Sequence, residues 1–180
     1  MTYSKITDIS LHRLTLRRLK ITDAKHFYRF ASNKNVSKYM LWVPHKTIEE
    51  SMHSIERSIT KYEEGKYYRW GIALKGSDVL IGIIQLLSFD ETHNSCSFAY
   101  MLGEEYWGNG YGCEALSGVI NYAFNSLDID TIKADHFSQN IASGKVMRKC
   151  GMTHIGTSLN KYEKNGVLFD ADNYVILRTK

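Results

Sequence analysis

One stretch in the middle of the chain restricts the possible folds more than any other. Residues 95–116 read as a strand, a glycine-rich turn and the start of a helix. Glycines at 108, 110 and 112 allow positive φ angles and a close approach of the main chain to an anion. Backbone N–H groups at the positive end of a helix dipole suit the pyrophosphate of a nucleotide-like cofactor. A glycine turn can also join a strand to a helix for packing alone, so the spacing leaves both interpretations open.

Two known phosphate loops can be compared with this turn. A P-loop is excluded, because no Lys-Ser or Lys-Thr pair follows a glycine anywhere in the chain. Residues 110–115 do fit the dinucleotide pattern GxGxxA, with Asp128, Asp130 or Asp135 roughly 20 residues further on. The doubly wound fold, however, needs more parallel strands than the roughly 65 residues after the loop can supply. A dinucleotide-dependent oxidoreductase is therefore a much less favoured function than one that uses another phosphate-bearing cofactor.

The elements around the turn predict a mixed sheet. Three strand-like runs precede it, Tyr68–Leu74, Val79–Phe89 and Ser95–Leu102, and their short turn-rich connections favour antiparallel hairpins. After it, apolar residues at steps of three and four up to Leu127 predict an amphipathic helix. The other predicted elements are a strand near residues 11–16, a helix opening at Thr22 and Asp23, a helix from Thr47 to Glu64 capped by Gly65, a strand at 131–137, a helix at 140–150, and strands at 153–162 and 173–179.

The predicted fold class is accordingly α+β, with a mixed and mostly antiparallel sheet of about seven strands and about four helices on its two faces. Residues 1–180 form a single domain in this interpretation, because the chain shows no linker, repeat or low-complexity stretch. Met1 to Asp8 are polar, and no apolar run approaches the roughly 20 residues of a membrane helix. We expect a cytoplasmic protein that does not bind a membrane.

Charge and cysteine content narrow the class of partners. Residues 1–70 carry a net charge of +7 and residues 71–180 a net charge of −3. The positive charge of residues 1–70 can attract an anionic partner, or it can be charge scattered over the solvated surface. No sequence module for nucleic-acid binding accompanies it. Cys96, Cys113 and Cys150 are widely spaced and form no CxxC pair, which argues against a disulfide framework and a metal site. Buried free thiols are expected.

The turn and a later segment resemble one family, the GNAT superfamily of acyl-CoA N-acyltransferases. Its phosphate-loop pattern matches Trp107 to Gly112, except that Trp107 replaces the usual Gln or Arg. The run Glu-Tyr-Trp-Gly-x-Gly-Tyr-Gly-x-Glu-Ala looks like the RimJ/RimL branch of ribosomal-protein N-acetyltransferases, in which Trp is common at this place. Asn140-Ile-Ala-Ser143, followed by Lys149-Cys-Gly151-Met, is similar to the Asn-x-x-Ser helix of that branch. The similarity extends from about Leu11 to Arg178.

The resemblance implies acetyl-CoA as cosubstrate, no metal, and a set of cofactor-binding residues. In the family, the main chain of the strand before the loop bonds the pantetheine arm, a role that falls here on Tyr100, Met101 and Leu102. The loop backbone holds the pyrophosphate, and a helix-opening asparagine contacts the cofactor arm, although Asn140 is equally a good N-cap. The loop residues concerned are Trp107, Gly108, Asn109, Gly110, Tyr111, Gly112 and Cys113.

The implied reaction is direct attack of a neutral amine on the thioester through a tetrahedral intermediate. Many family members use a tyrosine to protonate the leaving thiolate, but the matching residue here is Met147, which has no proton to give. Ser143 is the candidate for hydrogen-bonding the sulfur, and a local bond at the helix start is the structural alternative. Candidates for the base are Glu105, Asp135, His136, Glu163 and a water chain.

The resemblance places the amine acceptor between residues 39–45 and 160–169, where Trp42 and Pro44 either line the groove or anchor the chain crossing. The predicted function is N-acetylation of a primary amine, with a protein N-terminus of the ribosomal-protein type as acceptor. The alternatives are a small amine, such as a polyamine, amino acid or drug, and a non-catalytic acyl-CoA sensor, which the missing tyrosine keeps open. A homodimer is compatible with the resemblance.

Overall fold

The computed structural model describes residues 6–64 and 67–179. The elements of the first half are β1 (Ile9–Ser10), β2 (Leu14–Arg17), the 3-10 helix η1 (Ile21–Asp23), α1 (Ala24–Ala31), α2 (Lys34–Ser37), α3 (Ile48–Glu64), β3 (Tyr68–Leu74), β4 (Leu80–Asp90) and β5 (Ser95–Leu102). Those of the second half are the 3-10 helix η2 (Glu104–Tyr106), α4 (Tyr111–Ser126), β6 (Thr131–Phe137), α5 (Ile141–Lys149), β7 (Thr153–Lys164) and β8 (Val167–Leu177).

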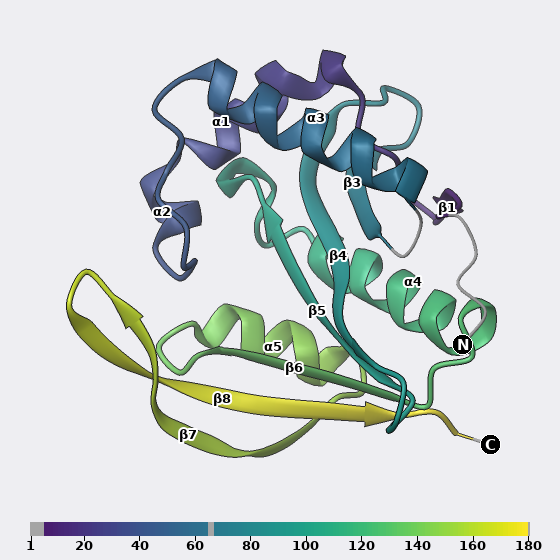
Figure 1. Ribbon diagram of the computed structural model, residues 1–180, viewed down its shortest axis with the longest axis vertical. Helices are drawn as coiled ribbons and strands as arrows, with labels where there is room; N and C mark the ends of the chain where they lie inside the picture. The colour runs from purple at the N-terminus through teal and green to yellow at the C-terminus, as the bar shows by residue number, and fades with distance from the viewer. Residues whose placement is uncertain (1–5, 65–66, 180) are drawn as a thin grey trace.

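All eight strands form one sheet in the order β1-β2-β3-β4-β5-β6-β8-β7. Every neighbouring pair is antiparallel except β5 and β6, which are parallel. Helices α1 and α3 cover one face of the sheet, and α4 and α5 cover the other (Figure 1). The predicted mixed, mostly antiparallel sheet with helices on both faces is confirmed, with eight strands instead of about seven.

Two hydrophobic clusters fill the layers on either side of the sheet. On the α4 and α5 face, Leu116, Val119 and Ala123 of α4 are fully buried against the apolar residues of the strands. On the other face, Phe27 of α1 and Ile55 of α3 pack with residues of β4 and β5. Strand β4 is buried at its first five residues, because it lies within the sheet and is covered from both sides. Packing on both faces of the sheet therefore fixes the positions of β4 and β5.

Element boundaries follow the sequence closely where the pattern is local. The bounds of β3, β5 and β6 agree with the predicted strands, and α3 begins one residue after its predicted cap, Thr47. Gly65, predicted as the cap that ends this helix, lies outside the described residues. Strand β8 starts at Val167, six residues earlier than predicted, because its first half pairs with β7 in a long hairpin.

The parallel pair β5 and β6 is held together only at its beginning. Its register joins Ser95 to Thr131, Cys96 to Ile132 and Ser97 to Lys133, and no later residues pair. Figure 1 shows the two strands side by side near their start and diverging toward their ends. Strand β5 stays paired with β4 as far as Leu102, and β6 stays paired with β8 as far as Phe137. A gap therefore opens within the sheet.

Candidate active site

The glycine loop forms the start of α4. Gly108 and Gly110 have φ angles of 77° and 79°, a backbone region that side chains with a Cβ disfavour. The first intrahelical bond runs from Glu114 N–H to the Gly110 carbonyl, at 3.0 Å. The N–H groups of residues 111–113 thus have no partner within the helix and face outward at its positive end. They can bind an anionic group such as a pyrophosphate.

Arg13, just before β2, braces this loop from outside. Its Nε donates to Glu114 Oε2 at 2.7 Å and its Nη1 to the Asn109 carbonyl at 2.9 Å, and the guanidinium lies over the Tyr111 ring. Burial raises the pKa of Glu114, but hydrogen bonds from the Arg13 N–H and guanidinium outweigh it, so that the pKa is lowered overall. The carboxylate stays ionised and fixes the first turn of α4. The sequence prediction missed Arg13, which carries no local motif.

A cavity of about 530 Å³ opens over the loop and along β5. It is lined by all the predicted cofactor residues except Asn109, whose side chain instead turns back to the Tyr106 and Trp107 carbonyls. Trp107 lies at the rim, and its indole N–H donates to the Leu102 carbonyl at 2.9 Å. That bond ties the loop to the end of β5. The residues usual in the family at this place, Gln and Arg, have no indole, so this indole hydrogen bond depends on Trp107.

Two lysines on α5 also line this cavity. Lys145 and Lys149 stand four residues apart, so they share one face of the helix. Both are exposed, and neither makes an ion pair with any described residue. Free ammonium groups at a cavity wall attract phosphate oxygens. The spacing of the two lysines is visible in the sequence, but their face of the helix is known only from the fold.

Three polar side chains meet at the gap between β5 and β6, two from the start of α5 and one from β5. Asn140 caps the helix by accepting from Ser143 N–H, and its Nδ2 donates to Ser143 Oγ at 3.2 Å. The Tyr100 hydroxyl of β5 lies 3.4 Å from the same Oγ. Burial raises the pKa of Tyr100, although the bond to Ser143 acts the other way. The phenol therefore keeps its proton at neutral pH.

A second cavity, of about 470 Å³, lies across the gap and is called the acceptor cavity below. Its floor is formed by β4 and β5, and its walls by β6, the segment after α2, and Tyr162 of β7. The residues that line both cavities are Tyr39, Met40, Tyr100, Met101, Asn140 and Ser143. The two cavities therefore meet at the cluster of Tyr100, Asn140 and Ser143.

Residues 13–153 match the acetyltransferase (GNAT) domain family. The chain belongs to the GNAT acetyltransferases. It is thus an acyl-CoA-dependent N-acetyltransferase that uses acetyl-CoA, and the resemblance inferred from the glycine loop is confirmed at the level of the superfamily.

Individual relatives agree with this assignment. The N-acetyltransferase YoaA of Bacillus subtilis is 29% identical over 168 residues, which span 93% of this chain and 95% of YoaA. A GNAT-family acetyltransferase structure from Bacillus anthracis superposes with a TM-score of 0.86 at 22% identity, over 95% of this chain and 98% of that one. Spermidine N-acetyltransferase from Vibrio cholerae, solved with CoA and spermine, gives a TM-score of 0.78 at 22% identity, over 92% and 95% of the two chains.

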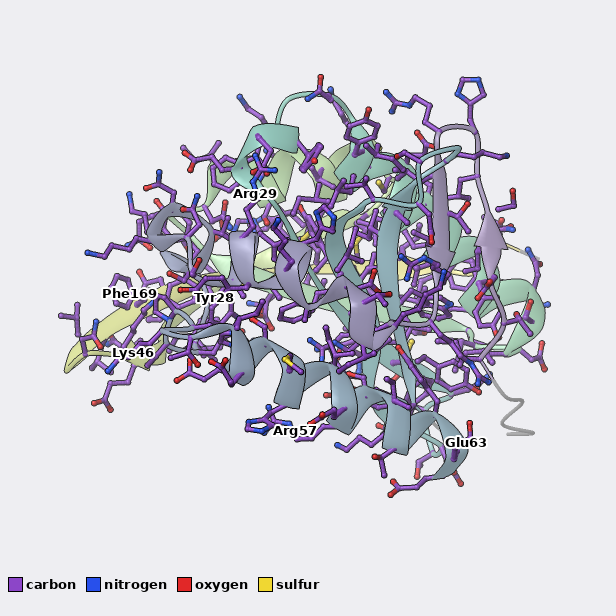
Figure 2. The ribbon with its side chains drawn as sticks, turned by 90° about the horizontal axis from the view of Figure 1, so that it is seen from above. Tyr28, Arg29, Lys46, Arg57, Glu63 and Phe169 are labelled. Atoms are coloured by element: carbon purple, nitrogen blue, oxygen red, sulfur yellow. The ribbon has the colours of Figure 1, made fainter. Side chains whose placement is uncertain are left out.

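The candidates for the base occupy different places in the acetyltransferase. Glu105 lies on η2 and lines neither cavity, and its carboxylate pairs at 2.9 Å with Arg29 of α1, which is labelled in Figure 2. Glu163 is exposed on β7 and also lines neither. Asp135 and His136 of β6 both line the acceptor cavity.

Asp135 and His136 differ in what their polar atoms contact. The Asp135 carboxylate accepts a short bond from the Tyr162 hydroxyl and another from Lys161 Nζ at 2.7 Å. His136 Nδ1 lies 2.8 Å from the Phe137 carbonyl, which fixes the hydrogen on that nitrogen. Its Nε2 is buried without a partner among the described residues, and it faces Gly144, where an added Cβ would lie 2.7 Å from it.

Only part of the expected acceptor segments lines this cavity. Tyr39 to Trp42 line the acceptor cavity, whereas Pro44 and His45 do not. His45 instead lies 2.8 Å from Ser51 at the start of α3. Trp42 is thus part of the cavity wall, and Pro44 is not. Of residues 160–169, Tyr162 alone lines the cavity.

Two sets of hydrogen bonds anchor residues 33–40, which contain α2 and the residues Tyr39 and Met40 that line both cavities. Lys164 Nζ of the β7–β8 hairpin donates to the carbonyls of Ser37, Lys38 and Met40 at 2.6, 3.1 and 2.7 Å. On the other side, the Asn33 and Asn35 amides both donate to the Glu104 carboxylate, at 2.8 and 2.7 Å. The segment is thereby fixed to the hairpin and to η2. Neither anchor was predicted.

Within the described residues, no group of three or more His, Cys, Asp or Glu side chains is placed to hold a metal ion. In the same part of the chain, no helix combines the length and the apolar character that crossing a membrane requires. The three cysteines are free thiols as expected, but only Cys96 is buried, whereas Cys113 and Cys150 are half-buried.

Proposed function

We propose that the acetyltransferase acetylates a primary amine that enters through the acceptor cavity, with a protein N-terminus of the RimJ/RimL type as the leading acceptor. The observation that carries the proposal is the meeting of the two cavities at Tyr100, Asn140 and Ser143. A thioester held along the open edge of β5 lies there between the cofactor side and the amine side of the sheet.

Residues of the chain supply the groups that the reaction needs. An N–H on Tyr100, Met101 or Leu102 that faces the gap is free to bond an amide of the pantetheine arm, because β6 has diverged from β5 at this level. The loop N–H groups and the α5 lysines supply positive charge for phosphates. The Asn140 Nδ2–H donates a hydrogen bond to Ser143 Oγ, so the serine can direct its own hydrogen elsewhere.

The transfer breaks the C–S bond of the thioester and forms a C–N amide bond. The ammonium of the acceptor first loses a proton, which we assign to water in the acceptor cavity, and the neutral nitrogen then attacks the carbonyl carbon. The departing thiolate takes a proton from the Tyr100 phenol, with Ser143 donating a hydrogen bond to the sulfur. The attacking nitrogen loses a second proton to water as the tetrahedral intermediate collapses, and Tyr100 regains a proton from solvent. The sum is an acetamide, CoA thiol and one released proton.

The place of Tyr100 also bears on the sensor alternative. Met147, at the position of the usual family tyrosine, is buried and lines the acceptor cavity. A phenol reaches the same gap from β5 instead, so the missing tyrosine does not leave the thiolate without a donor. This geometry favours a catalyst over a non-catalytic sensor.

The test is to measure release of free CoA thiol from acetyl-CoA with a panel of peptides and small amines. Turnover above the rate in solvent with at least one amine is expected, together with acetyl-CoA binding by calorimetry. Tight binding without amine-dependent thiol release would refute the proposal and favour the sensor. The cytoplasmic location and the homodimer remain predictions that fractionation and light scattering can check.

A further inference from the structure

The acceptor cavity differs from a polyamine site in its charge. Among the described residues that line it, Asp135 carries the only carboxylate. This carboxylate is already engaged by Lys161 Nζ at 2.7 Å and by the Tyr162 hydroxyl. Lys161 is held in place by a second bond, to Asn173 Oδ1 at 3.1 Å. The negative charge available for a guest is therefore at most one.

The rest of the wall is mainly apolar and aromatic. Phe137 is almost fully buried, and its ring stacks on Tyr162 with centroids 4.9 Å apart and meets Tyr39 at 6.2 Å. Trp42 comes from the segment after α2, and Phe98 from β5. Aromatic faces bind an apolar body well and stabilise one nearby ammonium through cation–π attraction.

These two features select among amines by charge. A polyamine carries several ammonium groups, and each one that enters an apolar cavity without a counter-ion costs free energy. A monoamine brings one ammonium, for which Asp135 and the rings suffice, and its body replaces water on the aromatic wall. Spermine and spermidine are thus mismatched to this cavity, although a relative of the same fold was solved with spermine.

We propose that the acceptor is a primary amine with a single positive charge on an apolar or aromatic body, and that Asp135 holds its ammonium while the rings of Tyr39 and Tyr162, supported from behind by Phe137, pack on the body. The inference rests on the proposed acetyl transfer and narrows its substrate class. A small arylalkylamine and a peptide N-terminus with an apolar first side chain share this chemistry.

The experiment compares four acceptors at saturating acetyl-CoA by release of CoA thiol: phenethylamine, a peptide that begins with Phe, a peptide that begins with Lys, and spermidine. We expect kcat/KM for phenethylamine or the Phe peptide to exceed that for spermidine at least tenfold. Whichever of phenethylamine and the Phe peptide has the higher kcat/KM identifies the source of the amine. A preference for spermidine overturns the inference but leaves the acetyl transfer standing, whereas no turnover with any amine overturns both.

Two variants with opposite expected effects on KM test the role of Asp135. Asp135→Asn should raise KM for the monoamine about tenfold, because it removes the counter-charge. Lys161→Met should lower that KM, because it frees the carboxylate. A merely structural role for the pair would shift KM in the same direction in both variants, and that result would overturn the assignment. Glu163→Gln, also on β7 but outside both cavities, is the matched control and should leave KM unchanged.

Folding of the variants is checked in the same samples. The dissociation constant of CoA from calorimetry should stay within about twofold of the wild-type value for both, because Asp135 and Lys161 do not line the cofactor cavity. An unchanged KM in Asp135→Asn, with CoA binding intact, would count decisively against Asp135 as the ammonium partner.

Discussion

Replacing Ser143 by alanine should slow acetyl transfer without weakening substrate binding. The Oγ accepts from Asn140 Nδ2 at 3.2 Å and lies 3.4 Å from the Tyr100 hydroxyl, so its own proton can point into the gap. A hydrogen bond to a charged group is worth about 1.5–3 kcal/mol. If this bond forms only as the sulfur becomes a thiolate, its loss lowers kcat by about 10- to 150-fold. KM for both substrates should change little.

The assay is steady-state release of CoA thiol with one amine that is turned over well. Tyr100→Phe should lower kcat by a similar factor, and the double variant should lose less than the product of the two factors, because both hydroxyls serve one sulfur. Ser117→Ala, on the exposed side of α4, is the control and should keep the wild-type kcat. Wild-type kcat in Ser143→Ala, or a purely multiplicative double variant, would refute the shared role.

Further predictions concern the cofactor wall, the hairpin and a thiol. Lys145→Ala combined with Lys149→Ala should raise the CoA dissociation constant about tenfold at low salt and less at 1 M salt, whereas Lys133→Ala, outside both cavities, should not. Lys164→Met should cost about 1 kcal/mol of unfolding free energy and lower Tm by about 2–4 °C, measured by calorimetry; an unchanged Tm would contradict the anchor. Burial raises the pKa of Cys150 to about 12, so iodoacetamide should label this thiol slowly at pH 8. Rapid labelling of Cys150, measured by mass spectrometry, would contradict this prediction.

Much of the fold could be read from local patterns. Alternating and three-to-four spacings are properties of short segments, so β6 and α4 were predicted near their observed bounds. The glycine loop is equally local, because positive φ at Gly108 and Gly110 depends on the residue itself. Ser143 and Asn140 were found through the motif that contains them. These residues meet in the structure as the resemblance implies.

Other parts of the site have no local signature. Lys164 and its partner Ser37 are 127 residues apart in the sequence, and Arg13 and its partner Glu114 are 101 residues apart. Such pairs depend on which strands neighbour each other and in what register, and these depend on the packing of the whole sheet. The candidates for the base were separated for the same reason, since Glu105 and Glu163 lie outside the cavities.

The sequence by itself pointed to the cofactor, because the glycine loop and the Asn140–Gly151 segment together resemble one family, whereas the spacing of the loop alone also fits a dinucleotide turn. Only the tertiary structure decided how the amine side is built. The divergence of β6 from β5 opens the gap, the hairpin brings Tyr162 to it, and the Tyr100 hydroxyl lies beside Ser143 there. The physical reason is that a cavity is made by side chains far apart in the chain, and its charge is the sum of partners such as Asp135 and Lys161 that no short segment contains.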